Sequence, residues 1–328
     1  MKSRAFFAFL GLFVSASALA TPIKIGFVLS TLQEERYQKD QKYFLAEAKK
    51  LGFEAIIVSA ENNAQTQTAK VENLLSQGVK ALVIQPVNSK AAANLVNMAH
   101  EDKVPVVAYD RIISDVGVDF YVTQDSFKVG VLQGEAAVKA TGGKGNYVIL
   151  RGQAGHSVAN DITSGIYSVL KKYPAIKVVM EKSHDAWSAS AALATVENAL
   201  TQNKNKIDAI LANNSGMANG AVQALAAQSL TGKVFVAGAD ADLASIKNIV
   251  AGKQQFEVLK EIAPLAETSA RVAFELAQGK KPKFDSTIES GKFKVPMIST
   301  PVYGVTKDNL EERVYKTGFH TKAQVGAL

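Results

Sequence analysis

Short apolar segments alternate with amphipathic segments along most of the chain, and this alternation restricts the possible folds more than any other feature. In the first half, strands are expected at 25–29, 55–58, 81–84, 104–108 and 120–123, with helices at 37–51, 66–76 and 91–100. Strands that alternate with helices in this order indicate a parallel sheet with helices on both faces. The sequence therefore predicts an α/β fold with a doubly wound parallel sheet.

The second half of the chain repeats this pattern. Segment 71–77 (VENLLSQ) precedes the expected strand at Ala81, and the similar segment 196–202 (VENALTQ), 125 residues further along, precedes the expected strand at Ala209. Helices are expected at 127–140, 162–172, 189–202 and 218–227, between strands at 146–150, 178–181, 209–212 and 234–237. The same order of elements around a similar segment is typical of an internal duplication. We therefore expect two similar parallel-sheet lobes.

The chain is expected to cross between the lobes more than once, because a long helix (264–278) and a proline-containing tail follow the second lobe. We predict a first lobe of residues 21–123 plus 260–294 and a second lobe of residues 124–259 plus 295–328. The hinge positions are expected near Thr123, Lys260 and Val295. Several crossings make a multi-strand hinge, which suits opening and closing around a ligand.

Residues 1–20 have the layout of a secretory signal peptide. Lys2 and Arg4 give a positive start, an apolar segment spans 5–14, and Ala18-Leu19-Ala20 forms a small-x-small cleavage site. The apolar segment is well short of the roughly 20 residues that a membrane-spanning helix needs. We therefore expect cleavage near Ala20 and a soluble protein exported to the periplasm.

Composition excludes several classes of function. The chain has no cysteine, so disulfides, thiolate metal sites and cysteine nucleophiles are excluded. Its formal charge is +7, but no run of basic residues exceeds two, which disfavours nucleic acid as a partner. The Gly-x-Ser-x-Gly and His-Glu-x-x-His motifs are absent, as are glycine-rich phosphate-binding loops. We expect no catalytic residues, no metal and no cofactor.

Polar and aromatic side chains follow the expected strands, at the edge of each sheet where ligands bind in folds of this type. In the first lobe these are Arg36, Tyr37, Asn88, Asp110 and Arg111, and in the second lobe Gln153, His156, Ser157, Asp185, Trp187, Asn213, Asn214 and Asp240. Carboxylate, amide and guanidinium groups form paired hydrogen bonds with neighbouring sugar hydroxyls, and aromatic rings cover the apolar face of a sugar. The alternatives are a surface ion pair for Asp110 with Arg111 and helix capping for Asn213, Asn214 or Asp240.

The sequence resembles the periplasmic sugar-binding proteins of ABC transporters, and among them most closely the D-xylose-binding members. The resemblance extends from Ile23 to about Phe319. It rests on segments 35–40 (ERYQKD), 108–111 (AYDR), 196–201 (VENALT), 203–209 (NKNKIDA) and 240–244 (DADLA). It implies the type I periplasmic binding protein fold, capture of a monosaccharide in a cleft between the lobes, and delivery to an ABC permease. It also implies a monomer, and leaves open whether a chemoreceptor reads the closed form.

The resemblance also implies roles for individual residues. Arg36, Arg111, Asn214, Asp240 and Lys260 fall at positions that hydrogen-bond the sugar in this family. Trp187 falls where a tryptophan stacks on the sugar, and Tyr37 replaces a second stacking tryptophan.

One loop, 151–158 (RGQAGHSV), departs from the D-xylose-binding members, which have a proline-containing loop with Asp-Asn-Asn there and an arginine further along. This chain has His156, Ser157, Val158 and then Thr163 instead, which changes the set of hydroxyls that this wall can satisfy. The expected ligand is therefore D-xylose or a related pentose. The alternatives are a hexose, a polyol or a nucleoside in the same cleft, or a sugar-processing enzyme.

Overall fold

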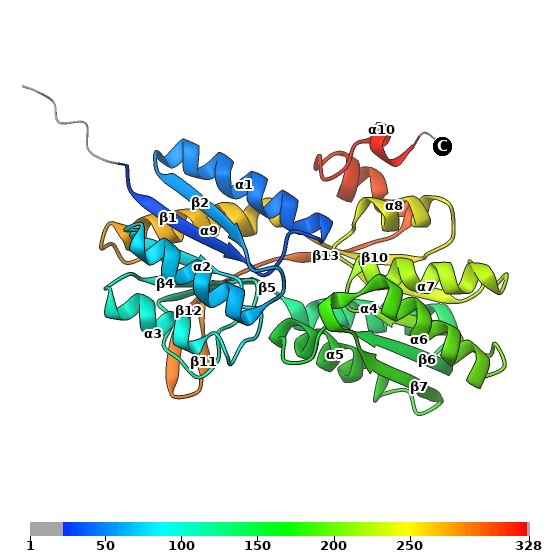
Figure 1. Cartoon of the computed structure of the whole chain (residues 1–328). Coiled ribbons are helices and arrows are strands. Elements are labelled where there is room, and N and C mark those ends of the chain that lie inside the picture. The colour runs from blue at the N-terminus through cyan, green and yellow to red at the C-terminus, as the bar shows by residue number, and fades with distance from the viewer. Residues whose placement is uncertain (1–21, 327–328) are drawn as a thin grey trace, which may run out of the picture.

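The computed structural model describes residues 22–326, which form two α/β lobes side by side (Figure 1). The expected signal peptide, residues 1–20, lies outside the described residues. The first lobe contains a seven-stranded sheet in the order β11-β12-β5-β4-β3-β1-β2. Its strands are β1 Lys24–Leu29, β2 Glu54–Ser59, β3 Ala81–Ile84, β4 Val106–Tyr109, β5 Phe120–Gln124, β11 Ser286–Ser290 and β12 Phe293–Thr300.

The second lobe contains a six-stranded sheet in the order β13-β10-β9-β8-β6-β7. Its strands are β6 Gly145–Arg151, β7 Ile176–Ser183, β8 Ala209–Ala212, β9 Phe235–Ala239, β10 Phe256–Lys260 and β13 Val302–Val305.

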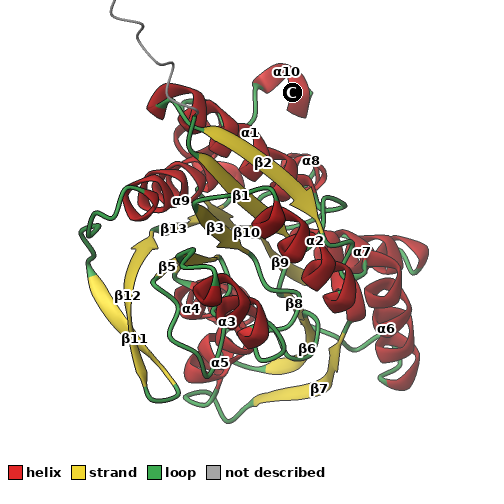
Figure 2. Ribbon diagram, turned by 60° about the vertical axis from the view of Figure 1, so that its left-hand side comes forward, coloured by secondary structure: helices red, strands yellow, loops and turns green. Residues whose placement is uncertain are grey.

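Helices flank both sheets (Figure 2). Those of the first lobe are α1 Glu35–Leu51, α2 Ala64–Ser76, α3 Ala93–Glu101 and α9 Ile262–Ala277, and those of the second are α4 Ser126–Thr141, α5 Ser157–Leu170, α6 Ala189–Gln202, α7 Ser215–Ala227, α8 Leu243–Val250 and α10 Lys322–Val325. No helix within residues 22–326 combines the length and apolar character that a membrane-spanning segment requires.

The predicted duplication is confirmed by the order of the strands. The first sheet contains the sequence β5-β4-β3-β1-β2, and the second contains β10-β9-β8-β6-β7, which is the same arrangement five strands later. The registers also correspond, since Ile25 pairs with Ala81 in the first lobe and Tyr147 pairs with Ala209 in the second. The central strands β3, β4 and β8 are buried along their whole length, as expected for parallel strands covered on both faces.

Each sheet also has an antiparallel edge that the sequence pattern did not indicate. β11 and β12 form a hairpin, and β12 then runs parallel to β5. In the second lobe, β13 pairs antiparallel with β10. The hairpin strands are only partly buried and carry proline and charged residues, so they lack the continuous apolar runs that identified the other strands.

The chain passes from one sheet to the other at Asp125, Glu261 and Pro301. The expected boundary at Val295 is wrong, because β12 remains paired with β5 as far as Thr300 and residues 295–300 therefore belong to the first lobe. The Gln124 side-chain amide donates to the Glu261 carbonyl oxygen at 3.1 Å, and the Thr300 hydroxyl donates to the Thr123 carbonyl oxygen at 3.3 Å. The crossings are therefore hydrogen-bonded to one another as a single hinge.

Candidate functional site

The predicted site residues are all buried, although most of them are polar. None of the nine has more than 6% of its surface exposed: Arg36, Tyr37, Asp110, Arg111, His156, Trp187, Asn214, Asp240 and Lys260. They come from both lobes and lie at the carboxyl ends of strands or at the helix starts that follow. Burial of so many polar side chains is costly unless they are paired with one another or with a ligand.

Arg36, in the first turn of α1, lies at the centre of a charged cluster. Its Nη1 is 3.4 Å from Asp240 Oδ1, its Nη2 is 3.3 Å from Asp110 Oδ1, and its Nε is 3.6 Å from Asp40 Oδ2. Lys260 Nζ lies 2.9 Å from the same Asp240 oxygen. Because Asp240 belongs to the second lobe, the Arg36–Asp240 ion pair joins the two lobes.

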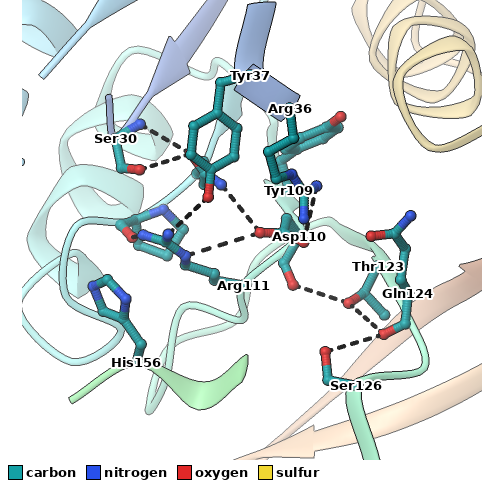
Figure 3. A network of polar contacts seen from close by, with 12 residues as sticks. Ser30, Arg36, Tyr37, Tyr109, Asp110, Arg111, Thr123, Gln124, Ser126 and His156 are labelled. Carbon is teal, nitrogen blue, oxygen red and sulfur yellow. Dashed lines mark hydrogen bonds and ion pairs between the residues drawn. The ribbon is translucent and has the colours of Figure 1, made fainter. Parts of the chain in front are cut away.

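Arg111 forms the second half of the site (Figure 3). Its Nη2 donates to the Tyr37 hydroxyl at 2.9 Å, and its Nη1 donates to the Pro86 carbonyl oxygen at 3.1 Å. Its guanidinium carbon lies 5.9 Å from the centre of the Trp187 ring, which belongs to the second lobe. The guanidinium of Arg111 thus lies between aromatic side chains of both lobes.

The two lobes build their site edges in the same way, as the duplication requires. In the first lobe, Gln85 follows β3 and its Oε1 accepts from the Ser30 backbone N–H at 3.1 Å. In the second lobe, Asn213 follows β8 and its Oδ1 accepts from the Gly152 backbone N–H at 3.0 Å. In each case an amide side chain fixes the loop that follows the first strand of the lobe, β1 or β6.

The two aspartates of the cluster also correspond. Asp110 follows β4 and Asp240 follows β9, and both have positive φ angles, 61° and 98°. Such angles are rare for residues other than glycine and are common at functional sites. Here they turn both carboxylates toward Arg36 from opposite lobes.

A buried carboxylate supports the strained turn after β9. Glu257 Oε2 accepts from the Ala241 backbone N–H at 3.1 Å and from the Ser215 hydroxyl at 3.0 Å. Glu257 Oε1 accepts from the Gln254 side chain at 2.7 Å. Burial raises the pKa of Glu257 to about 7, although these three hydrogen bonds act in the opposite direction.

The charges of the cluster shift one another's pKa values in different directions. Burial alone would raise the pKa of Asp110, but Arg36 and Lys260 outweigh it and hold that pKa below its ordinary value. For Asp40, burial outweighs Arg36 and raises the pKa to about 6. Of Asp110 and Asp40, Asp110 is therefore the more firmly ionised carboxylate at neutral pH.

Some residues of the site were not found from the sequence. Asp40 pairs with Arg36 one turn along α1 and accepts from the Tyr109 hydroxyl. Gln85 donates to Asp110 Oδ2 at 3.1 Å. The spacing of four residues between Arg36 and Asp40 is a usable signal for this pair, because such residues lie on the same helix face.

Two asparagines have local roles. Asn214 Oδ1 accepts from the Met217 backbone N–H at 2.9 Å, so the alternative that one of the paired asparagines caps the following helix is confirmed. Asn88 Oδ1 likewise accepts from the backbone N–H groups of Lys90 and Ala91.

Several buried polar atoms of this region have no hydrogen-bond partner within residues 22–326. They are Arg36 Nε and Nη2, Arg111 Nε, Asp40 Oδ2, Asn213 Nδ2 and Glu34 Oε1. The Arg36, Arg111 and Asp40 atoms lie 3.3–3.9 Å from oppositely charged atoms, so they take part in ion pairs but not in close hydrogen bonds. The set contains both donors and acceptors and draws on both lobes. A small uncharged ligand with several hydroxyl groups can satisfy such a set, since each hydroxyl both donates and accepts.

The histidines offer no general base here. His156 is the only one of the four in the site, and both of its ring nitrogens are engaged, by Trp187 and by Val87. Among the described residues, no group of three or more acidic or histidine side chains is arranged to hold a metal ion.

Two duplicated α/β lobes that meet over a buried polar site define a class of two-lobe ligand-binding proteins. Residues 25–281 match the model of the periplasmic binding protein domain, and the chain belongs to this family. The resemblance stated from the sequence is thereby confirmed.

The curated relatives include D-xylose-binding periplasmic proteins. That of Escherichia coli (strain K12) is 42% identical over 318 residues, covering 96% of each chain. That of Haemophilus influenzae is 39% identical and covers 95% of this chain and 94% of the relative.

Solved structures of the same fold include ABC transporter solute-binding proteins. One from Clostridium phytofermentans, with bound β-D-glucose, has a TM-score of 0.85 at 26% identity and covers 92% of this chain and 100% of its own. One from Bacillus halodurans, with bound myo-inositol, has a TM-score of 0.80 at 30% identity and covers 89% and 96%. These relatives and structures are named as binding proteins and not as enzymes.

Proposed function

We propose that this protein captures a monosaccharide, D-xylose or a related pentose, between its two lobes and delivers it to the permease of an ABC transporter. The observation that carries the proposal is the buried cluster in which Arg36 of the first lobe meets Asp240 and Lys260 of the second. Such a cluster is assembled only when the lobes are closed, so a ligand that completes its hydrogen bonds favours closure.

Each site residue except His156 contacts the sugar in this proposal. Arg36, Asp110, Asp240 and Lys260 hold ring hydroxyls from one side, and Arg111 and Asn214 from the other. Trp187 and Tyr37 cover the faces of the sugar ring. Support comes from the buried donors and acceptors of these side chains and their neighbours that lack a hydrogen-bond partner among the described residues, and from the sugar-binding relatives.

The protein is proposed to act as a binding protein and not as an enzyme. It works as a monomer in the periplasm after removal of the signal peptide near Ala20. The closed form presents a surface of both lobes to the permease, and a chemoreceptor that reads the same surface is compatible with this arrangement.

Calorimetric titration with a panel of D-xylose, L-arabinose, D-ribose, D-glucose, D-galactose, myo-inositol and a nucleoside tests the proposal. We expect saturable binding of D-xylose or another pentose. A heat signal only with a hexose, inositol or the nucleoside would reassign the ligand, and no response to any aldose would contradict sugar binding. Sugar turnover followed by NMR, and lost in Asp240→Asn or Asp110→Asn, would establish an enzyme instead.

The Asp240→Asn variant tests the site within the same experiment. Asparagine keeps the shape but removes the charge that Lys260 and Arg36 share, and a charge-assisted hydrogen bond contributes about 1.5–3 kcal/mol. We therefore expect affinity to fall by about 10–100-fold, at roughly 1.4 kcal/mol per factor of ten. The matched control is Asp308→Asn, an exposed aspartate of the same lobe, which should leave affinity unchanged.

A further inference from the structure

His156 was expected to contact the ligand, but its surroundings indicate a different role. The side chain is fully buried, with 0% of its surface exposed, and lies at the N-cap of α5. Its Nδ1 accepts from the Trp187 indole N–H at 2.9 Å. Its Nε2 is hydrogen-bonded to the carbonyl oxygen of Val87, which belongs to the first lobe. Neither ring nitrogen is therefore free for a sugar hydroxyl.

The partners fix which nitrogen carries the proton. The indole nitrogen of tryptophan only donates, and a carbonyl oxygen only accepts. Nδ1 must therefore hold the lone pair and Nε2 the proton, which describes a neutral imidazole. Burial and the nearby Arg111 lower the pKa of His156 to about 3, in agreement with the neutral form. The hydrogen bonds thus run in one direction, from Trp187 through His156 to Val87 across the lobe boundary.

The first-lobe end of this chain of hydrogen bonds is firmly held. The Val87 backbone N–H donates to Gln67 Oε1 at 3.0 Å, and Gln67 Nε2 donates to the Gln85 carbonyl oxygen at 2.8 Å. Arg111 donates to the carbonyl oxygen of the intervening Pro86. The loop whose Val87 carbonyl oxygen accepts the hydrogen bond from His156 therefore also accepts a hydrogen bond from Arg111.

Apart from the bond to His156, the Trp187 ring is held by packing in the core of the second lobe, with 6% of its surface exposed. It sits in a short turn in which Ala186 and Trp187 both have positive φ angles, 51° and 55°. One part of the indole packs against Gly152, where a Cβ atom would overlap three carbons of the ring. The bond to His156 is the only hydrogen bond made by the indole to residues 22–326.

We propose that His156 is a positioning residue that fixes the Trp187 indole when the lobes close. When the lobes separate, Val87 moves away with the first lobe, and the imidazole loses the bond that sets its proton and its ring orientation. The indole then loses a fixed acceptor. The aromatic wall of the site is therefore fully formed only in the closed state. This inference rests on the proposed sugar-binding function and assigns His156 an indirect part in it.

The single tryptophan of the chain makes this inference directly measurable, because fluorescence and the indole N–H resonance report Trp187 alone. The experiment compares wild type with His156→Phe, which keeps an aromatic ring and removes both hydrogen bonds, in the presence and absence of D-xylose. We expect the D-xylose-dependent change in indole chemical shift to be lost and affinity to fall about tenfold, the effect of one hydrogen bond. His156→Gln retains a donor and an acceptor and should recover part of both readouts.

Two further variants guard against misfolding and non-specific effects. Gly152→Ala displaces the indole without altering His156, and it should reproduce the loss of the indole signature. His100→Phe removes a partly exposed imidazole that is paired with Asp119 in the first lobe, and it should behave as wild type.

The nitrogen chemical shifts of His156 report which ring nitrogen carries the proton. A purely structural role of the side chain would not determine this tautomer. We expect the Nε2–H tautomer in the D-xylose complex. An Nδ1–H tautomer or a charged imidazole there, or a His156→Phe protein with unchanged affinity and indole shift, would overturn the inference. If wild type binds no sugar of the panel, the proposed function fails. If ligand-free wild type then shows the Nε2–H tautomer of the closed arrangement, an unchanged indole resonance in ligand-free His156→Phe would overturn the inference separately.

Discussion

Glu34 is a partly buried carboxyl beside the charged cluster, and its pKa is raised. It precedes Arg36 at the start of α1, and its Oε1 is buried without a hydrogen-bond partner among the described residues. Burial raises its pKa to about 7, against the opposing effect of Arg111. A carboxyl with a raised pKa favours the folded state while it is protonated, and this contribution is lost as pH rises from the unfolded pKa through the folded one.

We therefore predict that Glu34→Gln, which cannot ionise, is more stable than wild type at about pH 8. The gain should shrink as pH falls through 7 and vanish near the unfolded pKa of 4.5, with a slope of at most about 1.4 kcal/mol per pH unit. Urea unfolding at several pH values measures the difference. Glu54→Gln, at an exposed position of β2, is the control, and a gain that does not vary with pH would contradict the prediction.

Sequence reasoning found the residues at strand ends but not those that support them. Arg36, Asp110 and Asp240 could be predicted because a parallel sheet places its ligands beyond the carboxyl ends of its strands. Asp40 and Glu257 could not be predicted in the same way. Asp40 lies within a helix where an exposed carboxylate is ordinary, and Glu257 lies within a strand, so only the packed structure reveals which way each side chain faces.

At the scale of elements, the conformation of the turn between β9 and α8 depends on side chains that lie outside the turn. Asp240 and Ala241 both have positive φ angles, 98° and 56°, and such backbone costs of the order of 1–3 kcal/mol per residue. Glu257 holds the Ala241 N–H, while Ser215, itself bonded to Glu257, accepts from the Asp242 N–H at 3.1 Å. The position of Asp240 therefore depends on a carboxylate in the next strand.

We predict that Glu257→Ala lowers the free energy of unfolding by about 2–4 kcal/mol, since it leaves buried donors without an acceptor. It should also weaken D-xylose binding, because Asp240 is no longer held toward Lys260. Glu257→Gln keeps one acceptor and should lose less of both. Calorimetry and urea unfolding measure the two effects.

A double-mutant cycle separates positioning from general destabilisation. In an Asp240→Asn background the effect of Glu257→Ala on affinity should largely disappear, because coupled residues are not additive. Fully additive losses would show that Glu257 does not act through Asp240.

Element boundaries were predicted well where apolar periodicity is strong and poorly where capping or edge position decides them. Helix α5 begins at Ser157, five residues before the expected start at Ile162, and its first turn already buries Val158 and Ala159. The β11–β12 hairpin was missed because edge strands with one solvated face need no continuous apolar run.

For the whole molecule, contacts that lie outside the proposed ligand site also join the two lobes. The N-terminal end of α1 reaches α8 and the C-terminal segment of the second lobe (Figure 1). Glu35 Oε2 accepts from the Leu243 backbone N–H at 3.0 Å, and Lys39 Nζ lies 3.9 Å from the centre of the Phe319 ring. His320 is next to Phe319, and its Nε2 is hydrogen-bonded to the Ala241 carbonyl oxygen at 2.8 Å. None of these groups is among the proposed ligand contacts.

Contacts that exist only in the closed state raise ligand affinity by increasing the fraction of protein that is competent to bind. We predict that Lys39→Met, which removes the cation above Phe319, weakens D-xylose binding about two- to fivefold, since a partly exposed cation–π contact contributes about 0.5–1 kcal/mol. Calorimetry gives the affinity, and small-angle scattering should show a more open ligand-free protein.

The control is Lys42→Met on the same helix, because Lys42 Nζ lies 5.7 Å from the ring of Tyr43, its neighbour on α1. That contact stays within one lobe and is unaffected by closure, so this variant should bind as wild type does. Equal affinities for the Lys39 and Lys42 variants would mean that the C-terminal segment packs on α1 without favouring the closed state. A difference confined to Lys39→Met would instead show that residues outside the site set part of the free energy of binding, because closure and ligand capture are one coupled equilibrium.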